Sequence, residues 1–136
     1  MGLAERRKIR TFNDGLEDAQ KELNDFLGFD LPITLELESF PEEPAVISGY
    51  EYYKDYGFPQ TVEVLKSIGQ DDLGKEAIQE SIQSVVIRNT SKGTDDGGEC
   101  SMSLEDKVLL IKMGFYNYSD KLWDKHELIS EIEAKL

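Results

Sequence analysis

The chain has 136 residues, of which 32% are charged and 39% hydrophobic, and its formal net charge at pH 7 is −13. This length and composition are typical of one globular domain over residues 1–136, large enough to bury a core without disulfides or metals. The acidic balance argues against binding of DNA or RNA, because phosphate contacts need a basic surface. No apolar run approaches the roughly 18 residues of a membrane helix.

The N-terminal sequence and the cysteine content favour a cytoplasmic location. The basic residues between Arg6 and Arg10 are not followed by the apolar region of a secretory signal. Cys100 is the single cysteine and cannot form an internal disulfide, which fits a reducing compartment. The charge is uneven, since residues 11–60 hold 12 carboxylates against two lysines. Acidity can serve solubility alone, but such a field also attracts a basic protein partner.

The first predicted element is an amphipathic helix over residues 4–27. Gly28 is expected to end it in a left-handed conformation, although Asn13-Asp14-Gly15 could form a turn that splits it. The apolar residues that form one stripe at spacings of three and four are Ile9, Phe12, Leu16, Ala19, Leu23 and Phe26.

A strand is predicted after Pro32, because Ile33, Leu35 and Leu37 alternate with polar residues. Pro41 and Pro44 should end it, since proline interrupts a β-ladder. Residues 45–60 are ambiguous: a helix over 45–56 is conceivable, but glycines and a proline restrict its length.

Two short helices are expected next. The first contains Val62, Leu65 and Ile68 and ends at Gly69. Asp71 or Asp72 would cap the second, whose inward face is expected to hold Leu73, Ala77, Ile78 and Ile82.

The C-terminal half reads as three strands and a helix. Ser84–Asn89 is rich in β-branched residues, and a polar loop over 90–98 follows it. Residues 101–104 and 107–118 are predicted to form a hairpin that turns at Glu105-Asp106. The last helix is expected to be capped by Ser119, with Leu122, Ile129, Ile132 and Leu136 on its inner face and Leu128 near the edge of that face.

These elements predict an α+β two-layer sandwich. Its sheet would have about four strands in mostly antiparallel order, covered on one face by the N-terminal and C-terminal helices. The open face would carry Glu36, Glu38, Arg88 and Lys112.

No residue set points to a catalytic site, and we expect no enzyme activity and no cofactor. A Cys100–His126 dyad is disfavoured, because Asp95, Asp96 and Glu99 oppose formation of a thiolate. The 94–99 loop lacks the acid spacing of an EF-hand, and zinc is disfavoured by the shortage of Cys and His. No glycine pattern matches a phosphate loop, so no metal or nucleotide site is predicted.

The most informative segment is the aromatic and acidic run Tyr50–Phe58. Tyrosine combines a large apolar area with a polar tip and is enriched at protein interfaces. Alternate members of the run could equally pack into the core. The residues predicted to bind a partner are Tyr50, Glu51, Tyr52, Tyr53, Asp55 and Tyr56.

We therefore expect a protein-interaction domain with a basic protein partner. In the surface type of Tyr50–Phe58 and in net charge, the chain resembles bacterial toxin-immunity proteins, which implies an inhibitor of a basic toxin or enzyme. One alternative is a small-ligand-binding or enzymatic domain, with a pocket between sheet and helices where Arg88 or Lys112 would hold an anion. Another is a homodimeric structural subunit that pairs through strands around Leu109–Ile111.

Overall fold

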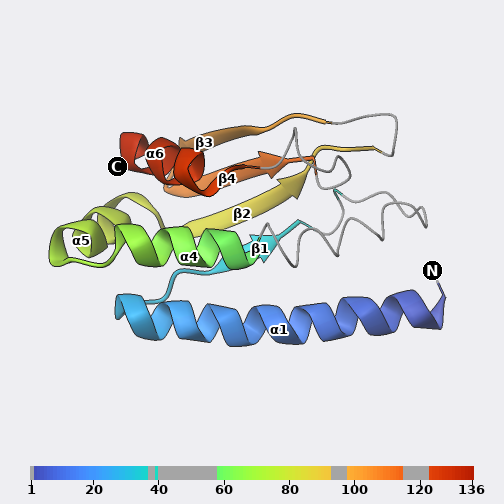
Figure 1. The fold of residues 1–136 in the computed structure, drawn as a ribbon. Helices are drawn as coiled ribbons and strands as arrows, with labels where there is room; N and C mark the ends of the chain where they lie inside the picture. Colours follow the sequence, from blue (N-terminus) through green and yellow to red (C-terminus); the bar gives the residue numbers. More distant parts are fainter. Residues whose placement is uncertain (1, 37–38, 40–57, 93–97, 115–122) are drawn as a thin grey trace.

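The structure is a computed structural model, which describes residues 2–36, 39, 58–92, 98–114 and 123–136. The chain forms an α+β fold in which a four-stranded sheet is covered by helices (Figure 1). In chain order the elements are α1 (Leu3–Leu27), β1 (Ile33–Leu35), α4 (Phe58–Ile68), α5 (Asp72–Ser81), β2 (Ser84–Asn89), β3 (Ser101–Glu105), β4 (Val108–Met113) and α6 (Lys125–Lys135).

The sheet is mixed and mostly parallel, so the prediction of a mostly antiparallel sheet is wrong. The strand order is β1-β2-β4-β3. β1 runs parallel to β2 and β2 runs parallel to β4, while only β3 and β4 are antiparallel. The parallel pairs arise because α4 and α5 carry the chain back between β1 and β2, and because β4 returns between β2 and β3 instead of outside them.

Side-chain polarity explains why β4, and not β3, lies next to β2. The central strands β2 and β4 each place three residues on the helix-covered face, and all of these residues are buried. β3 is Ser-Met-Ser-Leu-Glu and has no fully buried residue. A strand flanked on both sides buries more surface than an edge strand, so the apolar strand takes the inner position.

The inner position of β4 excludes the strand pairing that was expected for a homodimer, while the homodimer itself stays a prediction. Leu109, Leu110 and Ile111 pair with β2 on one side and with β3 on the other. Their main-chain groups are therefore not at an edge and cannot pair with a second copy.

The core lies between one face of the sheet and the helices. Figure 1 shows α4 and α6 in front of the strands and α1 alongside α4. One apolar cluster joins Leu23 and Leu27 of α1 to residues of α4, α5, all three parallel strands and α6. Its fully buried large side chains are Leu23, Leu31, Leu65, Ile78, Ile87, Leu109, Ile111, Met113 and Leu128.

The open face of the sheet carries charged pairs, as expected. The Arg88 guanidinium donates to both carboxylate oxygens of Glu36 at 3.0 and 3.1 Å. Lys112 pairs with Glu99 at 3.3 Å. Glu38 lies outside the described residues.

The first helix is confirmed as one continuous element, and no turn splits it at Gly15. Gly28 ends it with φ of 85°, and its N–H donates to the Asn24 carbonyl at 2.9 Å. Phe26 does not belong to the buried stripe: it is 41% exposed, with the ammonium groups of Lys66 and Lys75 at 5.8 and 5.6 Å from its ring.

The next two helices are confirmed, with one error of orientation. α4 ends at Ile68, and the Asp71 carboxylate caps α5 by accepting from the Gly74 N–H at 2.7 Å. Leu73 was expected to face inward, but it is 76% exposed. It stands in the first turn of α5, while Ile78 in the next turn is buried.

The hairpin and the last helix depart from the sequence prediction in detail. The turn is Asp106-Lys107, one residue later than expected, and both residues have positive φ. The cap of α6 is Asp124, whose carboxylate accepts from the His126 N–H at 3.2 Å. Ser119 and Leu122 lie outside the described residues, and Leu128 is fully buried instead of near the edge. None of the helices described here is long and apolar enough to cross a membrane.

Candidate functional site

The tyrosine-rich segment lies outside the described residues. Positions 40–57 are not described, so the assignment of Tyr50, Glu51, Tyr52, Tyr53, Asp55 and Tyr56 to a binding site stays a prediction. The candidate site is therefore built here from the surface of the described helices and strands.

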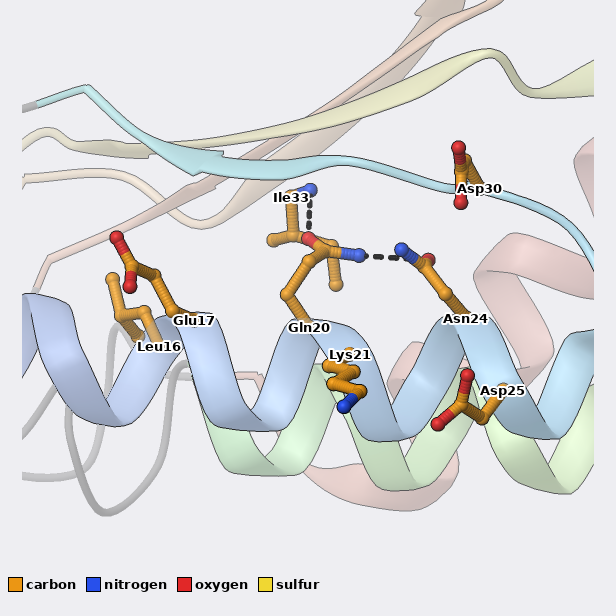
Figure 2. A pocket seen from close by; sticks show the side chains of 8 residues that line it. All are labelled: Leu16, Glu17, Gln20, Lys21, Asn24, Asp25, Asp30 and Ile33. Carbon is orange, nitrogen blue, oxygen red and sulfur yellow. Dashed lines mark hydrogen bonds between the residues drawn. The ribbon is translucent and has the colours of Figure 1, made fainter.

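A groove runs between α1 and the outer edge of β1 (Figure 2). Its volume is about 390 Å³. Gln20 and Asn24 point from α1 toward the strand, while Lys21 and Asp25 point away from it. The lining residues are Leu16, Glu17, Gln20, Lys21, Asn24, Asp25, Asp30 and Ile33.

The two amides in this groove have a structural role. Gln20 Oε1 accepts from the Ile33 N–H at 2.6 Å, and its Nε2 donates to the Leu31 carbonyl at 2.5 Å and to Asn24 Oδ1 at 3.0 Å. Asn24 Oδ1 also accepts from the Leu31 N–H at 2.9 Å. The amides thus satisfy main-chain groups that a neighbouring strand would otherwise bind, which protects the β1 edge.

The groups of the groove that stay available to a partner are charged. Glu17, Asp25 and Asp30 are exposed, and Lys21 is the one cation among the lining residues. No ion pair within the described residues uses any of these three carboxylates. The groove therefore combines acidic groups with the apolar side chains of Leu16 and Ile33.

A second recess of about 460 Å³ lies where β2 ends, a common ligand position in parallel sheets. Its polar groups, however, are bonded to one another. Asn89 donates to the carbonyls of Ser91 at 2.7 Å and Ser39 at 3.3 Å, and the Thr90 hydroxyl donates to the Glu99 carbonyl at 2.7 Å. These contacts hold the chain together where the strand ends, and Lys92 is the exposed cation among the described lining residues.

A third recess of about 330 Å³ lies at the start of α6 and is lined by Trp123, His126, Glu127, Ser130 and Glu131. His126 is exposed there, and Cys100 is half-buried directly before β3 in the chain. Within the residues that the structure describes, no three Cys, His, Asp or Glu side chains gather as metal ligands.

Carboxylates outnumber cations most strongly on the helices. Residues 14–30 hold six exposed carboxylates against Lys21. Residues 71–81 hold four against Lys75, and residues 124–136 hold four against Lys125 and Lys135. Among the described residues, four cations form ion pairs with carboxylates of the chain itself: Lys66–Glu22, Arg88–Glu36, Lys112–Glu99 and Lys125–Glu63. The C-terminal half of α1 together with α5 and α6 therefore forms an acidic helical layer, whereas the first turns of α1 carry the basic residues Arg6, Arg7, Lys8 and Arg10.

Comparisons with protein-family models, with curated protein sequences and with solved structures find no match to this chain. The candidate function accordingly rests on the geometry and charge described above.

Proposed function

We propose that this chain is a protein-binding domain that uses its acidic helical layer to bind a basic protein, in the manner of an inhibitor or immunity protein. The observation that supports it is the surplus of exposed carboxylates on the C-terminal half of α1, on α5 and on α6, where few cations neutralise them. Such a surface speeds association with a basic partner and disfavours acidic ones.

The described recesses give less support to a small-ligand function. The amides of the α1–β1 groove, and Asn89 and Thr90 at the end of β2, already bind the chain itself. Arg88 and Lys112, which an anion would need, are paired with Glu36 and Glu99.

The test compares two charge-matched variants in a pull-down. Glu17→Gln/Asp25→Asn removes two negative charges from α1, and Glu105→Gln/Asp106→Asn removes two from the exposed hairpin turn. Tagged proteins are incubated with lysate of the source organism at low and high salt, and retained proteins are identified by mass spectrometry.

The proposal predicts one basic protein that the wild type and the hairpin variant retain at low salt and the α1 variant retains less. High salt should weaken the wild-type interaction, because it screens exposed charges. Retention of no basic protein, or equal loss in both variants, would contradict a role for the helical layer. In the same assay Tyr52→Ala and Asp55→Lys test whether the tyrosine-rich segment contributes.

A further inference from the structure

The recess at the start of α6 combines an aromatic side chain with two acids. Trp123 lines it together with Glu127 and Glu131, which lie one helical turn apart and therefore on the same side of α6. Both carboxylates are exposed, and neither takes part in an ion pair with any described cation. Trp123 itself is half-buried and packs against the core.

Contacts with α4 hold this recess in place. The Gln60 amide donates to the Trp123 carbonyl at 2.8 Å, and Lys125 pairs with Glu63 at 3.4 Å. Lys125, the cation of α6 closest in sequence to Trp123 and Glu127, is thus directed toward α4. Leu128 and Ile132 are fully buried and fix the helix against the core. A partner side chain would therefore meet a tryptophan and a helix that are already held in place, which lowers the entropic cost of binding.

We propose that this recess receives an arginine side chain of the basic partner, an inference that rests on the proposed function. A guanidinium is planar and stacks on an indole, while its five N–H donors can bind two carboxylates at once. Lysine offers a compact ammonium without the planar shape, so it fits the same groups less well. Two full negative charges outweigh the partial positive charge of the helix N-terminus, which opposes a cation there.

Trp123 is the only tryptophan in the chain, so its fluorescence reports on this recess alone. The probes are blocked tetra-arginine and blocked tetra-lysine peptides, titrated at one pH and ionic strength. Calorimetry on the same samples measures binding anywhere on the protein. The variants are Glu131→Gln and the matched control Glu133→Gln, which is exposed on the same helix but does not line the recess.

We expect the arginine peptide to change Trp123 emission in a saturating manner and to bind at least about tenfold more tightly than the lysine peptide. Glu131→Gln should weaken the arginine peptide about tenfold, whereas Glu133→Gln should change its affinity less than twofold. Circular dichroism and urea unfolding establish that both variants are folded.

Any of three results would overturn the inference. Equal affinity for both peptides, or equal weakening by the two variants, would mean that only the overall charge matters. Calorimetric binding without any change in Trp123 emission would place the peptide elsewhere. None of these results contradicts the proposed function, which is tested separately by the pull-down and fails if no salt-sensitive basic partner is found there.

Discussion

The amide of Gln20 makes the clearest quantitative prediction of this structure. Its side chain joins α1 to β1 through the Ile33 N–H and the Leu31 carbonyl, 13 and 11 residues away in sequence. The substitution Gln20→Met keeps the length of the side chain and its helix propensity. It removes the hydrogen bonds to both main-chain groups. Each net hydrogen bond contributes about 1 kcal/mol, and unpaired main-chain groups add a desolvation cost.

We therefore expect Gln20→Met to lower the free energy of unfolding by about 2 kcal/mol. With an unfolding entropy of roughly 2.1 cal/mol/K per residue, this loss lowers the melting temperature of the 136-residue chain by about 7 °C. The assays are urea unfolding followed by circular dichroism and a thermal scan.

The matched control is Lys21→Met, which introduces the same side chain at the next position of the same groove. Lys21 is exposed and has no ion pair among the described residues, so this variant should change stability by less than about 0.5 kcal/mol. If the two variants lose the same stability, the amide contacts do not hold β1 against α1 and the reasoning is refuted.

Three further substitutions test the helices. Gly15→Ala should raise the unfolding free energy by about 0.5–1 kcal/mol, because an added Cβ meets nothing within 4 Å in mid-helix; urea unfolding would contradict this if stability fell. Gly74→Ala should cost more than about 2 kcal/mol, since its Cβ would lie 1.8 Å from the Ile68 carbonyl oxygen; an unchanged melting temperature would show that the backbone yields cheaply. Asp71→Ala should cost about 1 kcal/mol by removing the cap of α5, and hydrogen exchange at Gly74 should accelerate.

Local signals were sufficient to predict most helices and strands. The apolar stripe of α1 and the glycine after it located both ends of that helix, because periodicity and a left-handed cap are encoded in adjacent residues. The hairpin turn was missed by one residue, since Asp106-Lys107 adopts positive φ without the glycine that usually signals such a turn.

The order of the strands in the sheet was harder to predict from the sequence than the strands themselves. Short connections after residue 84 favoured antiparallel neighbours, but pairing between Val85 and Leu109 depends on which strand buries more apolar surface. The more apolar composition of β4 relative to β3 is the sequence signal for its inner position.

The features of the candidate site were largely invisible in the sequence. Gln20 and Asn24 occupy polar positions of an amphipathic helix, which resemble solvent-facing residues until β1 is placed beside them. The recess at Trp123 depends on Gln60, which is 63 residues away. The net charge predicted an acidic surface, but only the fold shows that the exposed carboxylates are concentrated on the helical layer.

The position of β4 between β2 and β3 constrains when the sheet can form during synthesis of the chain. Until β4 (Val108–Met113) has left the ribosome, β2 can pair with β1, but Leu109 and Ile111, the partners of Val85 and Ile87 on β4, do not yet exist. The nascent chain then exposes an apolar strand edge, which is the usual template for aggregation. A chain truncated before residue 113 should therefore precipitate instead of forming a smaller domain.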